Sequence, residues 1–159
     1  MAKIYMMCGR ICSGKSTYAE RLRKEQRAVV LSVDEITLAL FDGNTGSKHG
    51  EYVERAEKYL YAKSLEILEC DINVVLDWGF WTRAERDFAR EFYGSRGIEF
   101  EFIFIGISDE EWQRRIAKRN AAVEAGSISA YYVDEGLAEK FRGMYEPPSA
   151  DEKMTVISV

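Results

Sequence analysis

The chain has 159 residues and a formal net charge of −5, and charged residues of both signs make up 31% of it. This length fits one domain around a single hydrophobic core, and the composition is that of a folded globular protein. The acidic balance argues against broad binding to nucleic acid or to a membrane surface, because both require a basic face. The stretch before Gly9 is too short for a signal peptide or a membrane span, so we expect a cytoplasmic protein without membrane attachment.

Short apolar runs alternate with helical segments along the chain. The runs expected to form buried strands are residues 4–8, 28–33, 73–78, 99–107 and 154–159. The segments expected to form helices are residues 13–25, 34–41, 51–70, one that opens at Thr82 with the capping-box spacing to Glu85, one that opens at Ser108 with the same spacing to Glu111, and 134–142. A Gly/Ser/Ala-rich stretch at 121–130 is expected to interrupt the helical pattern. This order predicts a single three-layer α/β domain over residues 1–159, with helices on both faces of a parallel sheet.

Residues 9–16, Gly-Arg-Ile-Cys-Ser-Gly-Lys-Ser, match the phosphate-binding pattern G-x-x-x-x-G-K-[ST] between an expected strand and an expected helix. Glycines let the backbone N–H groups turn inward around phosphate oxygens, and the helix N-terminus adds positive potential. We expect Lys15 to reach the β- and γ-phosphates of ATP and to be catalytic, and the Ser16 hydroxyl to bind Mg²⁺. The predicted nucleotide-binding residues of this loop are Gly9, Arg10, Ile11, Cys12, Ser13, Gly14, Lys15, Ser16 and Thr17.

Asp34 follows the second apolar run, at the edge of the sheet where ligands of open α/β folds gather. A carboxylate there can accept a proton from an attacking hydroxyl, so Asp34 is the predicted general base. Two alternatives remain open at this point. Asp34 could only cap the following helix, or the neighbouring Glu35 could be the base.

Asp77 ends the third apolar run, in the sequence Val-Val-Leu-Asp-Trp-Gly-Phe-Trp. Beside a phosphate-binding loop, a carboxylate in this position holds magnesium directly or through water. Asp77 and Ser16 are therefore the predicted Mg²⁺ ligands, with ATP as the nucleotide. We expect Phe80 and Trp81 either in the core or in the wall of an acceptor pocket.

A basic run occupies the helix after the fourth strand, and its members Arg115 and Arg119 share one helical face because they are four residues apart. Together with the following Gly/Ser-rich stretch they predict a lid over residues 114–132. Its arginines would neutralise charge on the transferred phosphoryl group and help to exclude water. The alternative is a solvated basic face. Arg83 and Arg86 are weaker candidates for a catalytic role.

Taken together, the segments GRICSGKST, SVDEI, LDWGFWTRAERD, RRIAKRN and YEPPSADE make the whole chain resemble the predicted-kinase branch of the P-loop kinases, among the AAA-family ATP-binding proteins. The resemblance implies a five-stranded parallel sheet in the order 2-3-1-4-5. By position, Asp34 is similar to the acceptor-activating aspartate of polynucleotide 5′-kinase and chloramphenicol phosphotransferase. Arg115 and Arg119 match the lid arginines, and Pro147 lies where such kinases wrap the adenine of ATP.

These observations predict a kinase that transfers the γ-phosphate of ATP to a hydroxyl group of a small molecule. The expected acceptor pocket lies between Asp34, the 42–50 loop and the helix that begins near Glu51. A nucleic-acid 5′-hydroxyl kinase is disfavoured, because no basic acceptor groove is evident, and an ATP-hydrolysing regulatory module is the other alternative. We expect a monomer or a homodimer.

Overall fold

The computed structural model describes residues 1–42, 44–128 and 130–159, so the parts of the predicted 42–50 loop and 121–130 stretch at Gly43 and Ser129 lie outside the described residues. Within the described ranges, the sheet has the strands β1 (Lys3–Cys8), β2 (Ala28–Leu31), β3 (Asn73–Leu76), β4 (Glu99–Gly106) and β5 (Thr155–Ser158). The order is β2-β3-β1-β4-β5 and every neighbouring pair is parallel, with Ile4 of β1 opposite Val74 of β3. The predicted sheet and its strand order are confirmed.

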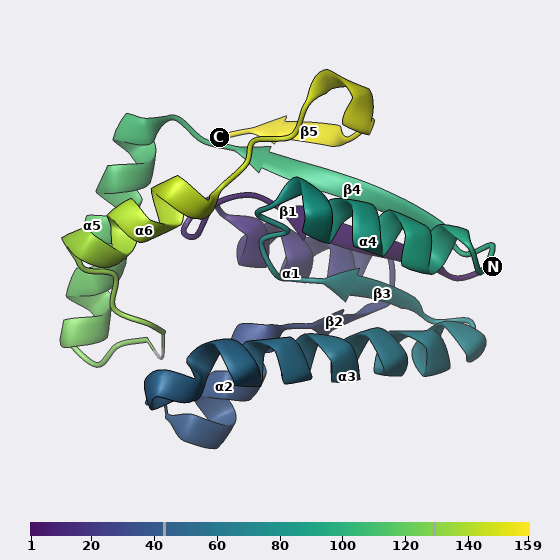
Figure 1. The fold of residues 1–159 in the computed structure, drawn as a ribbon, viewed down its shortest axis with the longest axis horizontal. Coiled ribbons are helices and arrows are strands. Elements are labelled where there is room, and N and C mark those ends of the chain that lie inside the picture. Colours follow the sequence, from purple (N-terminus) through teal and green to yellow (C-terminus); the bar gives the residue numbers. More distant parts are fainter. Residues whose placement is uncertain (43, 129) are drawn as a thin grey trace.

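The helices are α1 (Lys15–Glu25), α2 (Val33–Phe41), α3 (His49–Glu69), α4 (Arg83–Gly94), α5 (Asp109–Glu124) and α6 (Glu135–Met144), with short 3₁₀ turns at Gly46–Lys48 and Ala150–Glu152. Figure 1 shows α3 and α4 on one face of the sheet, with α1 behind it. In the same view α5 and α6 lie together beyond the carboxyl ends of β1 and β4. Within the described ranges, no helix has the length and hydropathy that a membrane span requires.

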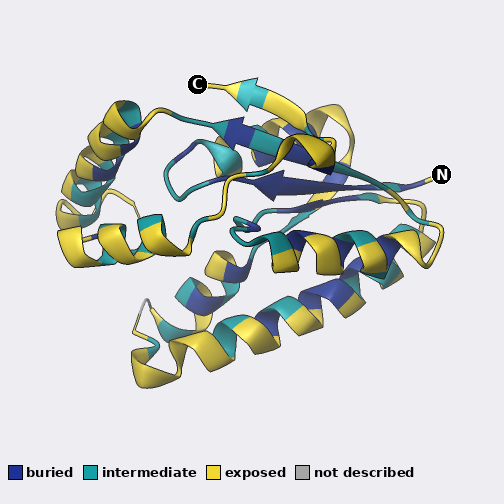
Figure 2. Ribbon diagram, turned by 45° about the horizontal axis from the view of Figure 1, so that its top comes forward, coloured by how far each residue is buried: buried dark blue, intermediate teal, exposed yellow. Residues whose placement is uncertain are grey.

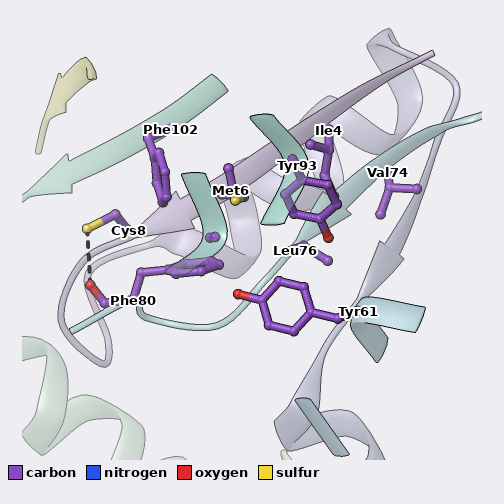
Figure 3. Close-up of a cluster of buried hydrophobic side chains, with 10 residues drawn as sticks. Ile4, Met6, Cys8, Tyr61, Val74, Leu76, Phe80, Tyr93 and Phe102 are labelled. Atoms are coloured by element: carbon purple, nitrogen blue, oxygen red, sulfur yellow. Dashed lines mark hydrogen bonds between the residues drawn. The ribbon is translucent and has the colours of Figure 1, made fainter. Parts of the chain in front are cut away.

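The central strand β1 is buried on both of its faces, which explains its unbroken apolar sequence (Figure 2). Successive side chains of a strand point to opposite faces. Ile4 and Met6 therefore pack with Tyr93 of α4 (Figure 3), whereas Met7 packs with Leu22 of α1 on the other face. Two hydrophobic layers thus hold the sheet between its helices and fix the carboxyl ends of the strands.

Capping side chains decide where α2 and α4 begin. The cap of α2 corrects two predictions, and the cap of α4 confirms one. The Ser32 hydroxyl accepts a hydrogen bond from the Glu35 backbone N–H (3.3 Å), so β2 ends at Leu31 and α2 begins at Val33. Asp34 is therefore the second residue of the helix and is not its cap. The Thr82–Glu85 capping box is confirmed on α4.

Helix α5 opens at Ser108 as predicted, but its capping interaction and its end differ from the prediction. Ser108 accepts from the backbone N–H of Glu111, but the Glu111 carboxylate binds arginines of its own helix, so only half of the predicted capping box forms. The helix continues to Glu124, through the first residues of the stretch that was expected to interrupt it. Alanine, which is frequent there, is the best helix former, and the chain leaves the helix only at Gly126, where φ is 69°.

Candidate active site

The phosphate-binding loop joins β1 to α1 and has the backbone shape that its glycines predict. Gly9 (φ 150°) and Gly14 (φ 101°) adopt conformations that side chains rarely permit. A Cβ atom at Gly9 would also lie 2.9 Å from the carbonyl oxygen of Ile105. The Gly9 N–H donates to the carbonyl of Gly79 (3.0 Å), which ties the loop to the segment after β3.

Trp81 supports the phosphate-binding loop from the side. Its indole N–H donates to the carbonyl of Gly9 (3.2 Å), and its ring packs edge-on against Phe141 of α6. Gly79 makes room for this indole, because a Cβ atom there would lie 1.9 Å from the indole nitrogen. Phe80, in contrast, is 1% exposed and belongs to the core (Figure 3). The two aromatic residues therefore have different structural roles.

Lys15, Ser16 and Asp77 lie together at the carboxyl end of the sheet. The Lys15 amino group donates to the carbonyl of Arg10 (2.6 Å). Burial lowers the pKa of Lys15, while the negative charges of Asp77 and Asp34 act in the opposite direction. Burial raises the pKa of Asp77, and a hydrogen bond from Ser16 and the charge of Lys15 offset part of that rise. The three side chains predicted to bind Mg²⁺ and phosphate are thus neighbours.

The first turn of α2 carries Asp34 and Glu35, and both side chains are exposed. The charge of Asp34 acts on the pKa of both Lys15 and Asp77, whereas that of Glu35 contributes to the pKa shift of Asp77. The assignment of Asp34 as the general base stays a prediction, and so does the alternative at Glu35.

Two arginines of α5 contact the phosphate-binding loop. Arg115 donates to the carbonyl of Ser13 (3.2 Å) and is oriented by the carboxylate of Glu111 (2.8 Å). Arg119 donates to the sulfur of Cys12 (3.3 Å). A solvated basic face is therefore wrong for this pair, and it describes instead the exposed Arg114, which pairs with Glu111.

Unsatisfied polar atoms at the loop fit a bound polyphosphate. In the described part of the chain, the Ser13 hydroxyl and the Nε atom of Arg119 are buried without a hydrogen-bond partner. Buried donors of this kind are costly unless something accepts from them. Phosphate oxygens held in the loop would be such acceptors, so these residues fit a polyphosphate such as that of ATP.

A cavity of about 290 Å³ lies beside the loop at the end of β4, lined by Arg10, Tyr145, Pro147 and residues 104–107. The guanidinium of Arg10 lies 4.7 Å from the Trp112 ring centre and is held by Asp109 (2.6 Å). A partly apolar cavity lined by an aromatic residue and an arginine suits an adenine ring. The assignment of Pro147 to the adenine site remains a prediction.

Arg83 and Arg86 have a structural role rather than a catalytic one. Arg86 is 1% exposed and donates two hydrogen bonds to Glu152 (2.7 and 2.9 Å) and one each to the carbonyls of Phe80 and Glu146. Arg83 pairs with Asp87 and Asp151 at the surface, among others. The sequence did not lead us to expect the role of Glu152 as the partner of Arg86. Its capping-box spacing, Ser-x-x-Glu at 149–152, could have indicated that it is structural, and the structure contains this capping box.

A second cavity lies further along α3 than the acceptor pocket expected near Glu51, whose position stays a prediction. This cavity of about 300 Å³ is lined by Glu57 and Tyr61 of α3, by Trp78, and by Ala84, Glu85 and Phe88 of α4. His49, at the start of α3, instead hydrogen-bonds Thr45 and packs edge-on against Tyr131.

Comparisons with known proteins agree with this architecture. The sequence matches the family described as AAA domain over residues 4–148, so the chain belongs to that family. A search of curated protein sequences finds no significant match.

Solved structures share the fold across most of the chain. A protein of Chloroflexus aurantiacus J-10-fl whose kinase assignment is provisional superposes with a TM-score of 0.74 at 16% identity, over 99% of this chain and 84% of that one. The APS kinase CysC of Mycobacterium tuberculosis, solved with AMPPNP and APS, gives 0.67 at 20%, over 99% and 88%. A chain of the Pnkp1/Rnl/Hen1 RNA repair complex gives 0.69 at 23%, over 90% of this chain and 43% of that one. The fold is that of the P-loop kinases.

Proposed function

We propose that this protein is a kinase that transfers the γ-phosphoryl group of ATP to a hydroxyl group of a small molecule. One observation carries the proposal: the carboxylates of Asp34 and Asp77 both act on the amino group of Lys15, at the end of a complete phosphate-binding loop. Such a set supplies a phosphate ligand, a metal ligand and a base within one site.

Binding of the nucleotide would use residues from three parts of the fold. Backbone N–H groups of residues 9–17 and the amino group of Lys15 would hold the triphosphate. Ser16 and Asp77 would hold Mg²⁺, and the cavity beside Arg10 and Pro147 would take the adenine. When bound, MgATP supplies the transferable phosphoryl group and the metal charge that stabilises it.

The remaining chemistry belongs to the side chains of this chain. The carboxylate of Asp34 accepts the proton of the acceptor hydroxyl. The oxygen of that hydroxyl bonds to the γ-phosphorus, while the bond from phosphorus to the leaving ADP oxygen breaks. Arg115 and Arg119 lie over the loop and offset the negative charge of the transferred group. Because Asp34 is exposed, it returns the proton to solvent.

A small-molecule acceptor is favoured over a nucleic acid for an electrostatic reason. The net charge of −5 and the two carboxylates, Glu57 and Glu85, that line the cavity between α3 and α4 disfavour a polyanion. Relatives of this fold include both an APS kinase and a chain of an RNA repair complex. The acceptor test therefore includes both kinds of substrate.

The experiment measures ADP release from MgATP against a panel of hydroxyl-bearing small molecules and 5′-hydroxyl oligonucleotides. Asp34→Asn should lower acceptor-dependent turnover by about 10²–10⁴-fold while ATP still binds, because the general base is lost. Glu35→Gln is the matched control and should stay close to wild type. If no acceptor stimulates turnover and Asp34→Asn leaves the basal rate of ATP hydrolysis unchanged, the results favour an ATP-hydrolysing regulatory module over a kinase. Loss of turnover in Glu35→Gln alone would move the base to Glu35.

A further inference from the structure

The cavity between α3 and α4 has three aromatic walls. Tyr61 lines it between two other rings, with the Trp78 ring centre 5.5 Å away and the Phe88 ring centre 5.2 Å away, and both rings stand at 77° to that of Tyr61. Tyr61 is buried, whereas Phe88 is 56% exposed, so the walls lead from the core to the surface. Rings at steep angles to one another offer both faces and edges to a ligand.

Two carboxylates complete the lining, Glu57 of α3 and Glu85 of α4. One oxygen of Glu85 accepts hydrogen bonds from the backbone and hydroxyl of Thr82 (2.8 and 2.9 Å). Burial, together with the negative charges of Glu85 and Glu54, raises the pKa of Glu57 to about 7. The charged groups that act on this pKa are thus acidic, and the two carboxylates of the lining repel each other when both are ionised.

We propose that this cavity is a subsite for an organic cation, a substituted ammonium group of a few carbon atoms. Aromatic faces attract cations through their quadrupoles, and ring edges pack against the alkyl groups. The carboxylate of Glu57 supplies the opposite charge at the wall of the cavity.

A neutral ligand of the same shape fits this lining less well. Aromatic walls with two carboxylates also occur where sugars bind, since hydroxyls donate to carboxylates and sugar rings stack on tryptophan. A neutral ligand, however, leaves the repulsion between Glu57 and Glu85 in place. A cation removes it and restores the ionised form of Glu57.

One wall of the subsite is connected to the proposed catalytic residues through the chain and through packing. Trp78 directly follows Asp77, and it packs against the cluster that contains Val33, the residue before Asp34. If the proposed function holds, on which this step rests, the acceptor is an amino alcohol. Its ammonium group would occupy the aromatic cavity while its hydroxyl group extends toward Asp34.

The test compares choline with its neutral isostere 3,3-dimethylbutan-1-ol, which has the same shape and hydroxyl group but no charge. Binding is measured by titration calorimetry on the full chain at pH 8, where Glu57 is ionised. Choline should bind at least about tenfold more tightly than the isostere. Glu57→Gln should abolish that preference, whereas Glu69→Gln, the same change at the exposed far end of α3, should preserve it.

Turnover measured with the same two compounds separates the two proposals. If choline binding depends on Glu57 but no acceptor stimulates ADP release, the cation subsite stands and the kinase proposal fails. If neutral alcohols are phosphorylated in an Asp34-dependent way while choline binds no better than its isostere, the kinase stands and the subsite is overturned. Equal binding of choline to wild type and Glu57→Gln also overturns it.

Discussion

Replacing Arg86 with methionine tests whether one buried ion pair holds together the segments around the active site. The guanidinium of Arg86 links Glu152 in the 3₁₀ turn before β5 to the carbonyls of Phe80, after β3, and Glu146, whose two neighbours in the chain line the cavity beside Arg10. Methionine keeps most of the side-chain volume and removes the charge and its donors. The carboxylate of Glu152 would then keep Arg90 (2.7 Å) as its nearest cation.

The expected loss follows from burial of the pair, both side chains of which are 1% exposed. Removing one partner of a buried pair costs about 3–5 kcal/mol, because the other charge stays buried. Arg90 remains beside Glu152, so we expect the lower end, about 3 kcal/mol at pH 7. The double variant Arg86→Met, Glu152→Gln should be about 1–2 kcal/mol more stable than Arg86→Met alone, because it leaves no unpaired carboxylate.

Urea unfolding at pH 7, with the free energy extrapolated to zero urea, measures these differences. Arg21→Met is the control, because it breaks an exposed pair with Glu25 and should cost less than about 1 kcal/mol. Equal losses of unfolding free energy in Arg86→Met and Arg21→Met would refute the reasoning. A double variant Arg86→Met, Glu152→Gln that is less stable than Arg86→Met alone would also refute it.

The pH dependence of this pair has a definite sign. Burial alone would raise the pKa of Glu152, but hydrogen bonds from Arg86 and Arg90 hold it well below its usual range. A depressed pKa in the folded state gives stability above the unfolded pKa, about 4.3, and this stability is lost as the pH falls. The difference between wild type and Arg86→Met should therefore shrink below pH 4.

Three further changes test other parts of the site. Arg119→Ala should lower acceptor-dependent turnover by about 100-fold, because its guanidinium lies over the phosphate-binding loop; Arg114→Ala, at the exposed side of the same helix, should not. Gly79→Ala should weaken nucleotide binding and lower the melting temperature, because its Cβ would meet the indole that supports the loop; Gly50→Ala, where a Cβ meets nothing within 4 Å, should be neutral or stabilising. Glu57→Gln should stabilise the fold by about 1–2 kcal/mol at pH 8 and little at pH 4. The raised pKa of Glu57 means that stability falls as the pH rises from about 4.3 toward 7, and urea unfolding at both pH values measures the difference.

Much of the fold could be predicted because local patterns determine it. Strands buried on both faces have continuous apolar sequences, and the phosphate-binding loop needs glycines at fixed spacing, so both are visible in the sequence. The predicted boundaries were wrong mainly at the ends of strands and helices, where a single side chain decides the boundary. Ser32 ends β2 two residues earlier than the apolar run suggested, because it caps α2.

The supports of the site could not be predicted in the same way. Arg86 and Glu152 are 66 residues apart, and Trp81 lies 72 residues from the Gly9 carbonyl to which it donates. Contacts over such distances depend on how the elements pack, and no spacing rule in one sequence reveals them. The aromatic cavity between α3 and α4 has the same origin, because its walls come from three separate segments.

The parallel sheet also affects how the chain folds during its synthesis. β1 is made before the other four strands described, yet it lies at the centre of the sheet, and its partner on one side follows 70 residues later, as the Lys3 to Asn73 hydrogen bond shows. At about 5–20 residues per second, the ribosome needs about 4–14 s to make this stretch. During that time the backbone of β1 lacks the neighbouring strand β3 with which it pairs in the folded protein. We therefore expect a nascent chain that ends before β3 to leave the apolar residues of β1 partly uncovered.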